Sequence, residues 1–360
     1  MSLKELTRSF TVEQPNFKNI LVVRTDRIGD VVLTTPALEA LRRAYPKAKI
    51  SLMVASATAE IVEGNPFIDE VIIYDKNGKD KGFVRFWRFV AALRQKHFDL
   101  AINYHLKSRM NWMLFHADIP CRIGFRNNKF GFLLTAQYPD CRAQGNRHES
   151  EYCLDLLRQA GIRAPGCGLF VSVKPEAEAW ADKILKDHRI TPTDLLVAVH
   201  PGASCLSKRW PPERFAEAAD RLIARDQAKI ILIGASRDLP LAQKILKSME
   251  HPVLDLVGKT TISRLISILK RCKLLVSNDS GPVHLSVGVK TPVISIFGRH
   301  QPGLSPSRWR PLGSNDVALH KDVGCKVCRA HRCERHFECL AAISVDHVLE
   351  AAQKILREDF

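Results

Sequence analysis

Loops that follow apolar runs carry the residues whose types and spacing could do chemistry. Arg24–Asp30 (RTDRIGD) lies between a run of apolar residues and a helical pattern. Gly29 lets the backbone come close to a ligand. The carboxylate of Asp30 could cap the helix by accepting backbone N–H groups, or could take a proton from an attacking hydroxyl. Spacing alone favours the cap, and the turn lacks the GxGxxG fingerprint of dinucleotide-binding proteins.

A second loop combines small residues with two adjacent cations. His200–Ser204 (HPGAS) is followed by Ser207–Pro211 (SKRWP). Backbone N–H groups in such a loop can hold a diphosphate, while Lys208 neutralises its charge. The spacing is not that of a P-loop. A basic loop without a ligand is the alternative interpretation.

A third loop, Val276–His284 (VSNDSGPVH), ends a predicted strand and begins a helix with Pro282 in its first turn. The N–H groups of Ser280 and Gly281 and the helix dipole together form an anion site. Asp279 could hydrogen-bond sugar hydroxyls. His284, one turn into the helix, could reach the same phosphates.

Two further features remain open. Asp238 comes soon after a predicted strand at 230–233, where a carboxylate suits a ribose diol but more often caps a helix. A cysteine-rich segment near the end has the spacing C-x2-C-x4-C-x5-C. Its four sulfurs could bind zinc, although the spacing is not the paired CxxC pattern, and packed or oxidisable thiols are the alternative. These cysteines are Cys325, Cys328, Cys333 and Cys339.

Alternating strands and helices must position these loops. Strands are predicted at 19–24, 50–55, 71–74 and 100–103, with helices at 30–45 and 83–96. The segment 122–147, rich in Arg, Lys, Gly and Asn, predicts an irregular loop region at one edge of the first domain. A second alternating unit begins at Leu195. The expected fold is therefore α/β, with two doubly wound domains facing each other across a cleft.

Length and charge agree with two domains and an anionic partner. The 360 residues are too many for one typical core. The net charge of +16 indicates phosphate, nucleic acid or an acidic membrane surface as partner. Scattered basic residues and 7% aromatic residues argue against nucleic acid. The missing GxGxxG turn argues against a nicotinamide-dependent dehydrogenase. We find no signal peptide in residues 1–19 and no apolar stretch that could span a bilayer, so a cytoplasmic protein is expected.

The three loops at 24–30, 200–211 and 276–284 together resemble those of bacterial lipopolysaccharide heptosyltransferases, glycosyltransferase family 9. The resemblance runs from Ile20 to about Leu356 and is strongest to heptosyltransferase II-like members. It implies a GT-B fold with an acceptor domain at 1–172, a donor domain at 173–344, and a terminal helix at 345–360 that crosses back to the first domain.

The same resemblance implies a reaction. Heptose is transferred from ADP-L-glycero-β-D-manno-heptose to the lipopolysaccharide inner core on lipid A, with inversion and without a metal or other cofactor. The protein would act peripherally on the cytoplasmic face of the inner membrane, without nucleic acid. Alternatives are a relative that uses another nucleotide-sugar donor or envelope acceptor, and a silent relative that only binds sugar nucleotide.

Carried over to this chain, the resemblance makes Asp30 the general base and Lys208 the cation that stabilises departing ADP. Asp279 would hold the donor sugar. Asp238 stands where the family often has Glu for the ribose. The other donor-binding candidates are Ser204, Ser280, Gly281 and His284. Because the inner core is anionic, basic residues of the first domain are acceptor-binding candidates, namely Arg27, Arg109, Arg122, Arg126, Lys129, Arg142, Arg147 and His148.

Overall fold

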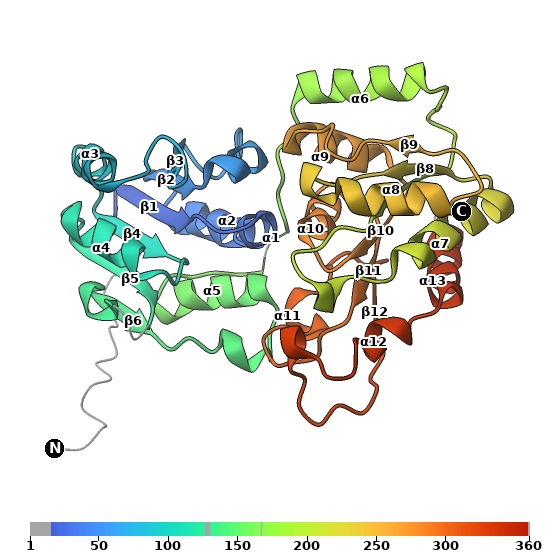
Figure 1. Ribbon diagram of the computed structural model, residues 1–360. Helices are drawn as coiled ribbons and strands as arrows, with labels where there is room; N and C mark the ends of the chain where they lie inside the picture. The colour runs from blue at the N-terminus through green and yellow to red at the C-terminus, as the bar shows by residue number, and fades with distance from the viewer. Residues whose placement is uncertain (1–15, 127–129, 167, 359–360) are drawn as a thin grey trace.

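The computed structural model describes residues 16–126, 130–166 and 168–358, which form two α/β domains side by side (Figure 1). Each domain contains a six-stranded sheet in which all neighbouring strands are parallel. The predicted α/β fold with two doubly wound domains is confirmed. The first sheet holds β1 (Asn19–Arg24), β2 (Lys49–Val54), β3 (Glu70–Ile73), β4 (Leu100–Asn103), β5 (Cys121–Phe125) and β6 (Ala136–Tyr138). The second holds β7 (Leu196–His200), β8 (Lys229–Leu232), β9 (Leu254–Asp255), β10 (Leu274–Asn278), β11 (Val293–Phe297) and β12 (Val317–His320).

The two sheets have the same strand order. The first runs β3-β2-β1-β4-β5-β6, and the second, read from its other edge, runs β9-β8-β7-β10-β11-β12. In each sheet the order reverses beside its first strand, between β1 and β4 and between β7 and β10. Ligands of open α/β sheets bind outside the carboxyl ends of the strands at such a reversal. All three predicted loops therefore begin at the expected places, after β1, β7 and β10.

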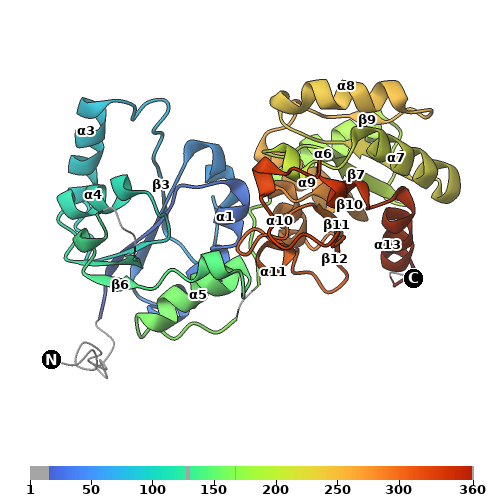
Figure 2. The same cartoon turned by 60° about the horizontal axis from the view of Figure 1, so that its bottom comes forward.

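Helices cover both faces of each sheet (Figures 1 and 2). In the first domain, α2 packs with α5, and α3 packs with α4. The helices of the first domain are α1 (Ile28–Val32), α2 (Thr35–Ala44), α3 (Phe83–Arg94), α4 (Ser108–His116) and α5 (Glu149–Gln159). Those that follow are α6 (Pro175–Asp187), α7 (Pro212–Asp226), α8 (Leu239–Ser248), α9 (Ile262–Arg271), α10 (Gly281–Gly288), α11 (Pro306–Trp309), α12 (Glu338–Ala341) and α13 (Val345–Glu358).

Two predictions about the first domain are wrong in detail. The single helix expected at 30–45 is divided into α1 and α2, because Pro36 cannot donate to the preceding turn and fits only near a new helix start. The segment 122–147 is not one irregular loop, since it contains most of β5 and all of β6. Its charged residues hide the strand pattern because these strands lie towards the sheet edge.

The last helix lies on the second domain. The α13 helix packs against α7 and contacts β10, β11 and β12. Val348, Ala352 and Ile355 are buried in the core of that domain. Both views place α13 on the side away from the first domain (Figures 1 and 2). The contacts thus contradict the implied crossing back to the first domain, because the apolar face of the helix is used on the second sheet.

The two domains meet where α1 crosses α10, close to the two strand reversals. This crossing is tight because glycines lie at the contact. A Cβ atom on Gly29 would lie 2.7 Å from Cδ2 of His284, and one on Gly281 would lie 2.9 Å from Cβ of Ile28. Around it, one apolar core cluster includes buried residues of both domains.

Replacing Gly29 with alanine should therefore lower the free energy of unfolding. The overpacking cost of about 1–3 kcal/mol exceeds the gain in helix propensity of at most about 1 kcal/mol. Urea unfolding measures the change. Gly166→Ala is the matched control, because a Cβ at that exposed position meets no atom within 4 Å. Equal effects of the two substitutions would contradict the tight crossing.

Candidate active site

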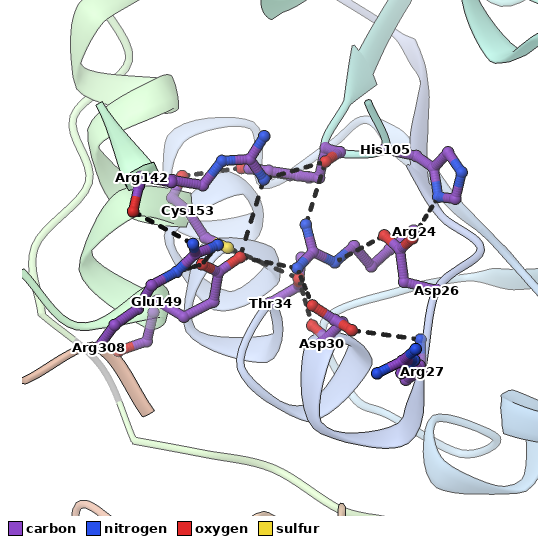
Figure 3. Close-up of polar contacts among 12 residues, drawn as sticks. Arg24, Asp26, Arg27, Asp30, Thr34, His105, Arg142, Glu149, Cys153 and Arg308 are labelled. Atoms are coloured by element: carbon purple, nitrogen blue, oxygen red, sulfur yellow. Dashed lines mark hydrogen bonds and ion pairs between the residues drawn. The ribbon is translucent and has the colours of Figure 1, made fainter. Parts of the chain in front are cut away.

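One buried carboxylate organises the first-domain side of the site (Figure 3). Glu149, at the start of α5, has no solvent exposure and accepts hydrogen bonds from Arg24 at 2.8 Å and Arg308 at 2.8 Å. The guanidinium of Arg142 lies 3.8 Å from the same carboxylate. These arginines come from β1, from the segment before α5 and from α11 of the second domain. Glu149 therefore joins three distant parts of the chain.

The arginine pairs outweigh the effect of burial on Glu149. Burial alone would raise the pKa of this carboxyl group, but Arg24, Arg308 and Arg142 together lower the pKa below its ordinary value. Glu149 is thus ionised at neutral pH. The cost of removing the carboxylate from water is offset only because its partners are positioned around it.

Arg24 connects this cluster to Asp30. Its Nη2 donates to Oδ1 of Asp30 at 2.8 Å as well as to Glu149. The other oxygen of Asp30 accepts the backbone N–H of Arg27 at 3.3 Å, so the carboxylate does serve as a helix cap. Two carboxylate oxygens have about four acceptor positions. Capping therefore leaves Asp30 free to accept a further proton, and its side chain is 21% exposed.

The surroundings of Asp30 favour proton uptake. Burial raises the pKa of Asp30, and the carboxylates of Asp26 and Glu149 raise it further, against the opposing effect of Arg24. A carboxylate with a raised pKa is a stronger base than an ordinary aspartate. Asp30 thus combines partial exposure at a sheet reversal with a raised pKa.

Asp26 and His105 form a pair that sequence reasoning missed. Oδ1 of Asp26 lies 2.6 Å from Nδ1 of His105, which follows β4. Burial raises the pKa of Asp26, but the hydrogen bond from His105 and the charge of Arg24 lower it below the ordinary value. Asp26 therefore stays ionised beside Asp30 and helps to raise the pKa of Asp30.

On the second domain, Lys208 and Asp279 lie together. Nζ of Lys208 is 2.6 Å from Oδ2 of Asp279 and donates to the Asp279 carbonyl oxygen at 3.2 Å. The guanidinium of Arg299 reaches the same carboxylate at 3.3 Å. Asp279 is thus paired with two cations, and its contact with the donor sugar stays a prediction. Arg299, which follows β11, is a second cation that sequence reasoning missed.

The start of α10 is where the sequence predicts an anion site, and anion binding there stays a prediction. The hydroxyl of Ser280, the N-cap residue, lies 3.0 Å from Nδ1 of His200. Burial lowers the pKa of His284 to about 3. His284 is therefore neutral at physiological pH, and its contact with a phosphate stays a prediction. Its Nδ1 has no hydrogen-bond partner in the part of the chain that the structure describes.

The remaining donor candidates differ in position. Asp238 is buried and accepts the backbone N–H of Ala235 at 3.0 Å, so it closes its own turn. Its carboxylate also faces the second loop, since a Cβ on Gly202 would lie 2.7 Å from Oδ2 of Asp238. Ser204 is exposed at the end of that loop. Both stay predictions as donor-binding residues.

Several acceptor candidates are engaged elsewhere. Arg122 lies near the amino end of β5, away from the site, and donates to the carbonyl oxygens of Leu133 and Ile119. This position contradicts its assignment to the acceptor site. Arg147 pairs with Asp155 on α5. Arg142 belongs to the Glu149 cluster, where Figure 3 shows it beside Arg308.

His148 also has a structural task. Its Nδ1 accepts the backbone N–H of Ser150 at 3.3 Å, and its Nε2 lies 2.9 Å from the carbonyl oxygen of Arg310 in the second domain. Burial lowers the pKa of His148, so the ring is neutral, which suits one accepting and one donating nitrogen. His148 therefore links the domains, and direct contact with the acceptor stays a prediction.

Three other acceptor candidates remain on the surface. Arg27 and Arg126 are exposed near the carboxyl ends of β1 and β5. The guanidinium of Arg109 lies 4.6 Å from the ring centre of Phe86. Lys129 lies outside the described residues. Arg27 and Arg126 thus keep the positions expected of acceptor contacts.

The cysteine-rich segment lies next to the second loop, residues 200–211. Cys325, Cys328, Cys333 and Cys339 line a cavity of about 350 Å³, together with Ser207 and Arg299. All four thiols are free. No group of three or more His, Cys, Asp or Glu within residues 16–126, 130–166 and 168–358 is arranged to hold a metal ion. The segment therefore packs beside Lys208, and its chemistry stays open.

Comparison with known proteins identifies the family. Residues 86–337 match the family described as glycosyltransferase family 9 (heptosyltransferase). The chain belongs to this family. It is a glycosyltransferase, and membership excludes the dehydrogenase alternative.

Relatives match nearly the whole chain. Lipopolysaccharide heptosyltransferase 3 of Escherichia coli (strain K12) is 26% identical, over 92% of this chain and 96% of the relative. A solved glycosyl transferase of family 9 from Veillonella parvula has a TM-score of 0.87 and 29% identity, covering 95% of this chain and 98% of that one. The structure of E. coli ADP-heptose lps heptosyltransferase II has a TM-score of 0.77 and 22% identity, covering 95% and 100%. The predicted GT-B fold is thereby confirmed.

Neutralising Glu149 should destabilise the enzyme strongly. Glu149→Gln removes the carboxylate that Arg24, Arg142 and Arg308 share, and within the described residues it leaves Arg308 without a carboxylate partner. Breaking this buried cluster should lower the free energy of unfolding by roughly 3–5 kcal/mol. Because the folded-state pKa is lowered, the wild-type contribution is full above the ordinary glutamate pKa. It is lost as the pH falls through the lower folded-state pKa. Urea unfolding at several pH values measures both effects.

Glu151→Gln is the control for this substitution. Glu151 lies on the same helix and pairs with Arg158 at the surface, where both side chains are more than one third exposed. Its replacement should cost less than about 1 kcal/mol. The role assigned to the Glu149 cluster fails if the two substitutions cost the same.

Proposed function

We propose that this enzyme transfers heptose from ADP-heptose to the inner core of lipopolysaccharide, with inversion and without a metal ion. The observation that carries the proposal is Asp30. It is a partly exposed carboxylate with a raised pKa, on a helix that packs against the predicted diphosphate-binding helix α10. The names of the relatives, which include lipopolysaccharide and ADP-heptose, supply the substrates.

The reaction assigns one task to each side of the domain contact. Asp30 accepts the proton of an acceptor hydroxyl, and the hydroxyl oxygen attacks the anomeric carbon. The bond from that carbon to the diphosphate breaks on the opposite face, so ADP leaves with the bonding electron pair. Lys208 and the amides at the start of α10 stabilise the charge on the departing ADP. The proton stays on Asp30 until it passes to solvent.

Protein cations support a reaction without a metal ion. Lys208 and Arg299 converge on Asp279 beside the start of α10. A diphosphate that binds here can replace Asp279 as the ion-pair partner of Lys208. Arg299 then remains paired with Asp279. Lys208 and the helix N-terminus then supply the positive charge that a divalent ion supplies in other transferases.

The acceptor and the location follow from charge. A net charge of +16 suits an acceptor that carries phosphates and carboxylates. No helix in the described part of the chain is long and apolar enough to cross a membrane. We place the enzyme on the cytoplasmic face of the inner membrane, in peripheral contact with the bilayer that holds the lipid A anchor.

Transfer from ADP-heptose to heptose-deficient core lipopolysaccharide tests this proposal, with EDTA present. Asp30→Asn should lower kcat by about 10²–10⁴-fold, the usual contribution of a general base, while ADP affinity measured by calorimetry stays the same. Asp182→Asn, at an exposed aspartate of the second domain, is the matched control and should keep full activity. Absence of transfer by the wild type, with ADP still bound, would contradict the donor or the acceptor. Full activity of Asp30→Asn would contradict the base.

The pH dependence gives a second test of the base. Asp30 acts only when deprotonated, so kcat/KM should rise with pH through the raised pKa of Asp30, with a midpoint above that of ordinary aspartate. The raised folded-state pKa also means that the ionised carboxylate costs stability above that pKa. Asp30→Asn should therefore lose the acidic limb without losing stability, as kinetics and urea unfolding measure. A limb that persists in the variant would assign it to another group.

A further inference from the structure

A row of aromatic side chains runs across the outer surface of the first domain. The rings of Phe83 and Trp87 on α3 have centres 6.1 Å apart, and Trp87 continues through His116 to Trp112 on α4. The ring centre of Trp112 is 5.4 Å from that of Phe130, and the ring centre of Phe130 is 6.0 Å from that of Phe132. We call Phe83, Trp87, Trp112, Phe130 and Phe132 the aromatic face. It spans three separate parts of the chain.

The ends of this face are exposed to a degree that is unusual for large apolar residues. Phe83 is 78% exposed, Phe132 is 74% exposed, and the neighbouring Val84 is also exposed. Phe86, Val90 and other residues of α3 already supply its buried side. Connected exposed aromatic residues mark interaction sites rather than core. Bulky aromatic rings suit the boundary between water and lipid.

Cations surround the aromatic face. Residues 81–126 contain nine Lys or Arg and two Asp or Glu. Arg85 and Arg88 are exposed on α3, beside Phe83 and Trp87. Helices with apolar residues flanked by arginine bind at membrane surfaces, and each cation near an anionic leaflet adds to the attraction.

From the charge complementarity, we propose that the aromatic face docks on an anionic phospholipid bilayer. Phe83 and Phe132 insert among the headgroups, while Arg85 and Arg88 contact lipid phosphates. Figures 1 and 2 show α3 and α4 on the side of the first domain away from the second, so docking leaves the domain contact unobstructed.

The topology connects this surface to the reaction. The α3 helix follows β3 and Phe130 follows β5, so both ends of the aromatic face start from the carboxyl edge of the first sheet. Asp30 follows β1 at the same edge. A lipid-anchored acceptor would thus be held on the side of the domain that carries the base. This biological role rests on the proposed function, but lipid binding itself is measured without donor or acceptor.

Sedimentation with vesicles tests the inference. The purified enzyme is mixed at 150 mM salt with vesicles of phosphatidylcholine alone or with 30% phosphatidylglycerol. We expect binding only to the anionic vesicles. Phe83→Ser/Phe132→Ser and Arg85→Glu/Arg88→Glu should each weaken that binding at least tenfold.

Matched controls change the second domain in the same way. Lys244→Glu/Lys247→Glu on α8 makes the same change in net charge, and Leu246→Ser removes an exposed apolar side chain there. Both controls should bind like the wild type. If Lys244→Glu/Lys247→Glu weakens vesicle binding as much as Arg85→Glu/Arg88→Glu, overall charge explains the binding. That result would overturn the inference. Failure of the wild type to bind anionic vesicles would also overturn it. So would a wild-type dimer, seen by light scattering, that Phe83→Ser/Phe132→Ser converts to a monomer.

Transfer assays separate this inference from the proposed function. Phe83→Ser/Phe132→Ser and Arg85→Glu/Arg88→Glu should both keep full transfer to a deacylated, soluble core acceptor. Both should lose most transfer to an acceptor embedded in anionic vesicles. If no soluble acceptor is used but vesicles still bind through the aromatic face, the proposed function fails and the docking surface stands. Equal loss of both transfer activities would contradict a docking role for the face.

Discussion

The ion cluster around Glu149 is the interaction on which the site depends. One carboxylate without solvent exposure binds arginines from β1, from the segment before α5 and from the second domain. A buried carboxylate with these partners favours a single arrangement, because displacing an arginine removes a charge partner from a group without solvent exposure. The cluster therefore fixes the relative position of three chain segments. Arg24 extends this order to Asp30, because the same guanidinium nitrogen contacts both carboxylates.

The cluster also explains why neighbouring carboxylates have pKa values shifted in opposite directions. Asp26 and Glu149 each have direct partners that keep them ionised, and their negative charges act on Asp30. Asp30 is mostly buried, and its cation partner Arg24 also pairs with Glu149. Asp30 therefore holds a proton more readily than ordinary aspartate. The difference in basicity comes from position rather than residue type. Environments that separate the pKa values of neighbouring carboxylates mark acid–base sites.

The second domain contributes charge of the other sign. Lys208, Arg299 and the start of α10 lie beside Asp279, and the glycine crossing brings α10 against α1. The glycines matter because a side chain at this contact would force α1 and α10 apart. His284, neutral and buried at the crossing, adds no charge there.

The sequence predicted the loops better than their surroundings. The three loops could be predicted because each loop follows an apolar run that indicates a strand. Parallel sheets bring the carboxyl ends of their strands to one edge. Glu149 and Arg308 were missed because their pairing depends on contacts across the chain that no local pattern records. Arg122 was misplaced for the same reason, since composition gives charge without direction. The terminal helix follows the general rule that packing decides which surface an amphipathic helix covers.

The most direct test of the account is a crystal structure with the 2-deoxy-2-fluoro analogue of ADP-heptose, whose transfer is slowed by the fluorine. We predict that the diphosphate contacts Lys208 and the amides of Ser280 and Gly281. The anomeric carbon should then face Asp30 on the side opposite the diphosphate. A donor bound away from α10, or with Asp30 on the same side as the diphosphate, would contradict the proposed site and its inverting mechanism.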